Sequence, residues 1–201
     1  MLDLLIKGGT VVDGTGSPGR VADVGVRDGR IVAVGDVTED ATETVDATGL
    51  VVCPGFVDPH THYDAQLFWD KRATPSNLFG VTSMVAGNCG FSLAPLGDEA
   101  DGDYLKRMMV KVEGMALEAL DQGVPWNWHT FGEYLDAVED GGLAVNVGFL
   151  VGHCALRRVV MKDSAVGELA TNEQIAEMRR LLKESIEAGG MGFSTGRSFT
   201  H

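Results

Sequence analysis

The chain has 201 residues, and 29 acidic residues against 16 basic ones give it a formal net charge of −13. This charge argues against nucleic acids, anionic membranes and other polyanions as partners, because these bind to basic surfaces. A hydrophobic content of 44% supports a buried core. No run of about 18 apolar residues occurs, so we expect a soluble protein with no membrane span.

The cysteines and the N-terminus indicate a reducing compartment. Cys53, Cys89 and Cys154 are too few and too scattered for a disulfide framework. Residues 1–7 lack the basic region and the long apolar stretch of a signal peptide. We therefore expect a cytoplasmic protein.

Short β segments separated by glycine fill residues 1–53. The pair Asp28-Gly29 lies between two apolar runs, which is typical of a tight hairpin whose two central residues need positive φ angles. This pattern predicts a small antiparallel sheet or sandwich, forming a first domain over residues 1–53.

From Pro54 onward, strands and helices alternate. Helix starts are indicated by two capping boxes, Thr130 with Glu133 and Thr171 with Gln174. A methionine-rich stretch at residues 104–120 has helical spacing, which favours core packing over a cofactor site. Buried strands are expected at residues 55–60, 81–86, 143–151 and 191–194. This alternation predicts an α/β domain over residues 54–201 with a parallel sheet, whose site lies at the carboxyl ends of the strands.

Two histidines follow the first of these strands, in Pro-Gly-Phe-Val-Asp-Pro-His-Thr-His-Tyr-Asp at residues 54–64. His60 and His62 are two residues apart, so in an extended strand both side chains would point to the same face. Neutral imidazole is a common ligand of zinc and similar ions. The pair therefore predicts a metal site, although two surface histidines at this spacing are not rare.

A cysteine follows the next strand, in Gly-Asn-Cys-Gly at residues 87–90. Neighbouring strand ends of a barrel lie close enough to share one cation, and a thiolate binds a divalent metal strongly. The alternative for Cys89 is a buried structural cysteine. Asn88, beside it, is a candidate for contacts that support the ligands or the substrate.

Four further polar residues flank the histidines or follow the third predicted strand. Asp58 and Asp64 flank the histidines, and either could orient an imidazole through its second nitrogen or form an ordinary strand-end or turn hydrogen bond. His153 could be a ligand, a supporting donor or a loop histidine. Arg157 could bind a substrate carboxylate, but a surface ion pair is the simpler expectation. His129 is expected to be structural.

Together these residues resemble the amidohydrolase superfamily, and within it the N-acyl-D-amino-acid deacylase (D-aminoacylase) branch. The resemblance covers nearly the whole chain. The Gly-Asn-Cys-Gly motif narrows it to this branch, because a cysteine there replaces the carboxylated lysine of hydantoinase-like relatives. The matching segments lie at residues 6–16, 55–64, 80–92, 126–131, 152–157 and 190–196.

The resemblance implies the first half of a metal-dependent (β/α)₈ TIM-type barrel, preceded by the small β domain. It implies that Cys89 binds zinc, and that His60 and His62 bind a second, often weaker metal position. Two more histidine ligands and a general-base aspartate would come from later strands. The family hydrolyses N-acyl-D-amino acids to a carboxylate and a D-amino acid. We therefore expect the isolated chain to be inactive until a complementary C-terminal chain or segment completes the barrel.

Two alternatives remain open from the sequence. One is another amidohydrolase, hydantoinase-like or dipeptidase-like, which differs in its substrate. The other is a non-catalytic subunit or fragment, for which no stoichiometric metal is expected.

Overall fold

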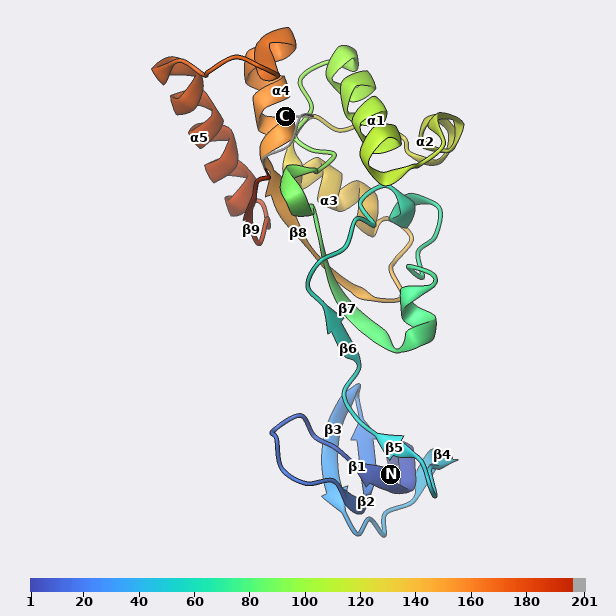
Figure 1. Cartoon of the computed structure of the whole chain (residues 1–201). Helices are drawn as coiled ribbons and strands as arrows, with labels where there is room; N and C mark the ends of the chain where they lie inside the picture. Colours follow the sequence, from blue (N-terminus) through green and yellow to red (C-terminus); the bar gives the residue numbers. More distant parts are fainter. Residues whose placement is uncertain (197–201) are drawn as a thin grey trace. The chain divides into compact units, whose positions relative to one another are not determined.

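The computed structural model describes residues 1–196, and Arg197 and His201 lie outside this range. The chain divides into two compact units, Met1–Gly55 and Phe56–His201 (Figure 1). None of the helices between residues 1 and 196 combines the length and apolarity needed to cross a bilayer.

The first unit is a five-stranded sheet around one central strand. That strand, β1, pairs antiparallel with β2, which pairs antiparallel with β3, so the predicted antiparallel sheet is confirmed. β4 and β5 pair with β1 in parallel, which makes the complete sheet mixed. The predicted hairpin turn is present, with φ angles of 51° at Asp28 and 68° at Gly29. The strands are β1 (Leu2–Val11), β2 (Arg20–Arg27), β3 (Arg30–Gly35), β4 (Ala41–Asp46) and β5 (Val51–Val52).

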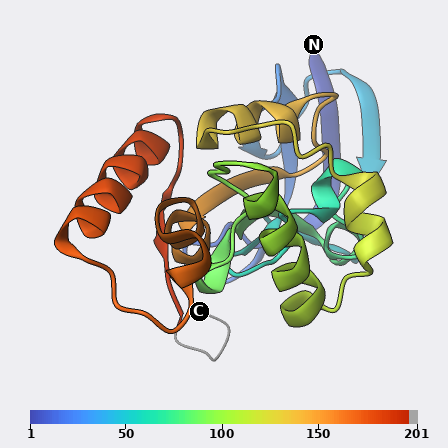
Figure 2. The ribbon, with the colours of Figure 1, turned by 90° about the horizontal axis from the view of Figure 1, so that it is seen from above.

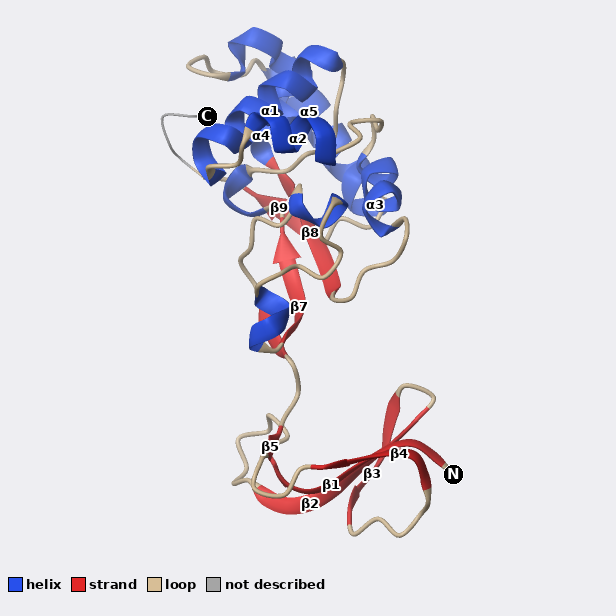
Figure 3. Ribbon diagram, turned by 90° about the vertical axis from the view of Figure 1, so that its right-hand side faces the viewer, coloured by secondary structure: helices blue, strands red, loops and turns tan. Residues whose placement is uncertain are grey.

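The second unit contains a parallel sheet of four strands in sequence order. This arrangement confirms the α/β prediction and is the strand order of a (β/α) barrel. The strands are β6 (Phe56–Asp58), β7 (Val81–Ala86), β8 (Asn146–Gly152) and β9 (Gly192–Ser194). In Figure 3, β7, β8 and β9 of this parallel sheet are labelled, and the helices lie beside them and toward their carboxyl ends.

Within residues 1–196, five α-helices accompany this sheet. Both predicted capping boxes are present, at Thr130 before α3 and at Thr171 before α5. The helix predicted at residues 104–120 is two helices, because Gly114 adopts a φ of 67° and ends α1. The helices are α1 (Glu99–Glu113), α2 (Leu117–Gly123), α3 (Phe131–Glu139), α4 (His153–Met161) and α5 (Asn172–Glu187). Seen from above in Figure 2, α5 (red) lies at one side of this unit and α2 (yellow-green) at the opposite side.

The core of this unit lies between the sheet and its helices. Met108 and Met109 are buried there, as the methionine-rich pattern predicts. Aromatic side chains fill the centre, where Trp128 stacks on Phe68 and donates its indole N–H to the Leu93 carbonyl at 2.8 Å. The buried indole thus has the polar partner that its N–H needs.

Buried charges tie α1 to α4. The Asp101 carboxylate is fully buried and accepts hydrogen bonds from Arg158 Nε at 2.8 Å and Lys162 Nζ at 2.6 Å. Arg158 also lies 5.0 Å from the centre of the Tyr104 ring. A paired buried carboxylate of this kind fixes the position of its helix, because losing either partner would leave an uncompensated charge.

The strand predicted at Phe56 and Val57 is present as β6, but the prediction that it is buried is wrong. The side chains are 60% and 66% exposed. Within the described sheet, β6 is an edge strand that pairs only with β7, so its side chains have neighbours on one side only.

Candidate metal centre

His60 and His62 lie in the loop after β6, not in the strand itself. The strand alternation used to predict their convergence is therefore not what aligns them. The Asp58 carboxylate accepts the His60 backbone N–H at 3.2 Å, which is the ordinary strand-end bond. The backbone N–H and the hydroxyl of Thr61 both donate to the Val85 carbonyl at 2.9 Å. These bonds hold the histidine loop against the end of β7.

Cys89 lies in the tight turn Asn88–Gly90, which follows β7 directly. The φ angle of Cys89 in this turn is 58°. Gly87 opens the turn with a φ of 76°, and a Cβ atom there would lie 2.1 Å from the Leu150 carbonyl oxygen. Only glycine fits this close approach to β8. The side-chain amide of Asn88 donates to the carbonyls of Thr61 and Val85, at 3.3 and 2.9 Å. Asn88 therefore joins the cysteine turn to the histidine loop.

Ser194, at the end of β9, supports the same turn from the other side. Its hydroxyl accepts the Gly90 N–H at 3.0 Å and donates to the Gly87 carbonyl. Three successive strands, β7, β8 and β9, thus meet the turn that presents Cys89. The ligand-bearing backbone is held by the sheet rather than by a free loop.

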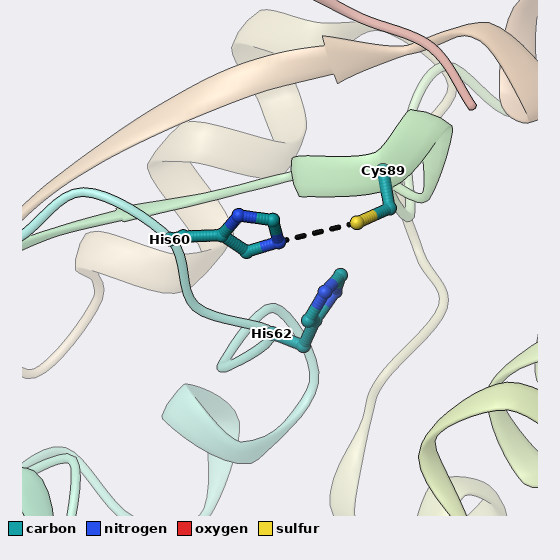
Figure 4. A group of neighbouring side chains, drawn as sticks. All are labelled: His60, His62 and Cys89. Atoms are coloured by element: carbon teal, nitrogen blue, oxygen red, sulfur yellow. Dashed lines mark hydrogen bonds between the residues drawn. The ribbon is translucent and has the colours of Figure 1, made fainter.

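His60, His62 and Cys89 converge on one point, and their candidate ligand atoms all lie within 4.8 Å of one another (Figure 4). The Nε2 atom of His60 is 3.1 Å from the Cys89 sulfur. Ligands of a tetrahedral zinc ion are about 3.3–3.6 Å apart when the bonds are about 2.0 Å to nitrogen and 2.3 Å to sulfur. Shifts of about 1 Å in these side chains would satisfy that geometry, and two imidazoles with one thiolate are ligands that zinc prefers. The residues present fit a zinc ion.

Glu113 lies beside this group, although no sequence signal singled it out. It is the last residue of α1, and its Oε1 is 3.4 Å from His62 Nδ1. That nitrogen is buried and has no hydrogen-bond partner within the described residues. Burial lowers the pKa of His62, while the charge of Glu113 opposes the change and His60 adds to it. A predominantly neutral imidazole is the form that binds a metal.

Asp64 is fully buried next to the site. One carboxylate oxygen accepts the Gly87 N–H at 3.1 Å, and the other has no partner within residues 1–196. Burial raises the pKa of Asp64 to about 7, opposed by the bond from Gly87. The Tyr134 hydroxyl also donates to the Asp64 backbone carbonyl at 3.2 Å. In this structure Asp64 supports the cysteine turn and forms no hydrogen bond with His60 or His62.

His153 and Arg157 are not part of this group. His153 is the first residue of α4, a helix that the sequence did not predict, and its Nδ1 is 3.1 Å from the Thr195 hydroxyl. The expected surface ion pair of Arg157 is wrong, because its guanidinium donates to the carbonyls of Ala165 and Glu168, both at 2.8 Å. These bonds fix the segment that follows α4.

The other two cysteines differ from Cys89 in environment. Cys53 is exposed. Cys154 is buried, and burial raises its pKa to about 12, so its thiol stays protonated. The His129 backbone N–H donates to Glu133 at 2.8 Å beside the capping box, consistent with a structural role.

Comparison with known proteins identifies close relatives. The chain is 45% identical to D-aminoacylase from Alcaligenes xylosoxydans xylosoxydans over 195 residues, which are 96% of this chain and 37% of that protein. It is 41% identical to N-acyl-D-aspartate deacylase from the same organism, covering 96% of this chain and 36% of that one. The chain thus spans little more than a third of the curated relatives it matches.

Solved structures lead to the same group. A D-aminoacylase structure described as having a binuclear metal centre matches with a TM-score of 0.82 and 41% identity, over 98% of this chain and 39% of that one. N-acyl-D-glutamate deacylase from Bordetella bronchiseptica, complexed with zinc and a phosphonate inhibitor, matches with a TM-score of 0.74 and 35% identity, over 97% and 38%. The model of the family described as "Amidohydrolase family" matches residues 43–201. This chain belongs to the amidohydrolase family.

Proposed function

We propose that the chain is part of a zinc-dependent N-acyl-D-amino-acid deacylase. The complete enzyme would hydrolyse the amide of an N-acylated D-amino acid and release a carboxylate and the free D-amino acid. The observation that carries this proposal is the convergence of His60, His62 and Cys89. The similarity to D-aminoacylase and two related deacylases supports the choice of substrate class.

In this proposal Cys89 holds a zinc ion, and His60 and His62 hold the same ion or a second, weaker one. A zinc ion in such a site supplies a Lewis acid that polarises the amide carbonyl and lowers the pKa of bound water. The residues around the ligands keep them in place. Thr61 and Asn88 hold the histidine loop to β7, and the Asp64 carboxylate holds the Gly87 amide.

We propose that the remaining metal ligands and the general-base aspartate come from a further segment or a complementary chain. Two observations support this. The chain spans little more than a third of its curated relatives. In the described sheet, β6 and β9 each pair with one neighbour only, so both edges are open to further strands. On this account residues 1–53 form a small β domain and residues 54–201 the first four units of an incomplete barrel.

The test compares the 201-residue chain with the chain in its complete protein. We expect zinc to bind both, and turnover of N-acetyl-D-amino acids only by the complete protein. Cys89→Ser is expected to abolish stoichiometric zinc, while Cys53→Ser, at an exposed thiol, leaves it unchanged. Robust turnover by the isolated chain would overturn the need for a further segment.

The alternatives predict other results in the same experiment. Hydrolysis of cyclic ureides or dipeptides in preference to N-acetyl-D-amino acids would favour a hydantoinase-like or dipeptidase-like enzyme. Absence of stoichiometric metal from the complete protein would favour a non-catalytic subunit.

We also propose a cytoplasmic location. All three cysteines are free, and free thiols are typical of a reducing compartment such as the cytosol. Cell fractionation with an antibody against the chain tests this location, and recovery in a secreted fraction would contradict it.

A further inference from the structure

We propose that Glu113 is a positioning residue for His62. Its carboxylate accepts a hydrogen bond from the N–H group at Nδ1 of the imidazole, which keeps the proton on Nδ1 and leaves Nε2 unprotonated for the metal. This inference rests on the metal centre proposed above and adds to it a residue that does not itself bind metal.

The first observation is the state of the His62 ring. Among residues 1–196, Nδ1 is buried and lacks a hydrogen-bond partner, yet Oε1 of Glu113 lies 3.4 Å away. Both side chains are mostly shielded from solvent, at 22% exposed for His62 and 17% for Glu113. A buried N–H without a partner is costly, whereas a small shift of the carboxylate would provide a charge-assisted bond.

The second observation concerns which acidic side chains can accept a hydrogen bond from His62 Nδ1. Within residues 1–196 it is the only acidic side chain whose carboxylate lies within 4 Å of a His62 ring nitrogen. Asp64 is two residues along the chain, but neither of its carboxylate oxygens lies within 4 Å of a His62 ring nitrogen, although only one of them is bonded, to the Gly87 amide. The rings of His60 and Phe91 flank His62, with centroids at 5.5 and 6.3 Å.

The third observation is that α1 places Glu113 rigidly. Near its start, the buried Asp101 is paired with Arg158 and Lys162 of the segment around α4. Met109, one turn before Glu113, is fully buried in the core. Gly114 ends the helix in the left-handed region with a φ of 67°. The helix that carries the Glu113 side chain is therefore held in place by the core.

The chemical consequence concerns the tautomer. A neutral imidazole carries one proton, and a carboxylate can only accept a hydrogen bond, so Glu113 favours the proton on Nδ1. The lone pair on Nε2 is then free for the metal. Partners of this kind change metal affinity by about 10- to 100-fold when they are removed.

Two variants separate the hydrogen-bonding role of Glu113 from the effect of its side-chain size. Glu113→Ala removes the acceptor, and we expect zinc to bind about 10- to 100-fold more weakly. Glu113→Gln keeps the shape, but its amide can also donate to Nδ1 and so favours the wrong tautomer; we expect a loss of affinity here as well. Glu118→Gln, at an exposed position on α2, is the matched control and should bind zinc as the unmodified chain does.

The experiment uses the 201-residue chain and two readouts. Competition with a chromophoric chelator measures zinc affinity, and nitrogen-15 NMR of the metal-free chain reports which His62 nitrogen carries the proton. We expect the proton on Nδ1 in the unmodified chain and its redistribution in both Glu113 variants. Unchanged zinc affinity in Glu113→Ala, or a proton on Nε2 of the unmodified chain, would overturn the proposal. If the unmodified chain binds no zinc, the metal centre fails, but the NMR measurement still decides the role of Glu113.

Discussion

Zinc should protect one cysteine, and only one, from alkylation. The chain carries one exposed, one half-buried and one buried thiol, at Cys53, Cys89 and Cys154. Without metal, iodoacetamide is expected to modify the first two. With saturating zinc, Cys89 should become unreactive because its sulfur is bound to the ion beside His60, whereas Cys53 continues to react at its original rate.

The structure also predicts that Cys154 should react very slowly with iodoacetamide. Only the thiolate reacts, and a pKa raised to about 12 leaves very little thiolate near neutral pH. At a pH of about 8 the thiolate fraction is on the order of a thousandfold below that of an ordinary cysteine with a pKa of about 8.5. Its modification should therefore be undetectable while the chain stays folded.

Peptide mass spectrometry after timed labelling measures all three sites in one sample. In Cys89→Ser, zinc should no longer change the labelling pattern, whereas Cys53→Ser should keep the zinc-dependent difference. If Cys89 is alkylated equally fast with and without saturating zinc, the convergence of ligands in Figure 4 does not form a metal site.

Three further predictions concern stability, each measured by denaturant unfolding. Gly87→Ala should destabilise the chain by more than about 1–3 kcal/mol, because its Cβ would meet the Leu150 carbonyl. The control Gly29→Ala also lies at a positive φ but has open space around its Cβ, so its loss of stability should be smaller. Equal losses of stability in the two variants would contradict the close approach of Gly87 to Leu150. Met109→Ala should cost about 2–5 kcal/mol at a fully buried site, while Val112→Ala on the exposed side of α1 should cost little. Zinc at about 100 times its Kd should stabilise the chain by about 2.7 kcal/mol, an effect that a chelator reverses; no shift would indicate that the folded state does not bind it.

Local signals in the sequence predicted much of the fold. The capping boxes at Thr130 and Thr171 and the Asp28-Gly29 turn depend only on neighbouring residues, and all three are present. The parallel strands followed from the alternation of apolar runs with helical segments. His60, His62 and Cys89 were predicted to meet because adjacent parallel strands end at the same edge of the sheet, and their side chains do converge.

Features that depend on packing were not predictable from the sequence. Glu113 reaches His62 only because α1 is anchored to α4 through Asp101, and no local pattern encodes that contact. The exposure of Phe56 depends on which strands pair with β6. Arg157 bonds to backbone carbonyls of the segment that follows α4, whereas the sequence suggested a surface ion pair or a substrate contact.

Cys89 should bind zinc in a metal centre that also contains His60 and His62. X-ray absorption at the zinc edge of the loaded chain tests it most directly, because sulfur and nitrogen ligands give different distances. We expect one sulfur at about 2.3 Å and imidazole nitrogens at about 2.0–2.1 Å from zinc, with the sulfur lost in Cys89→Ser and imidazole scattering reduced in His60→Ala. A zinc shell of oxygen and nitrogen only, unchanged in both variants, would contradict it.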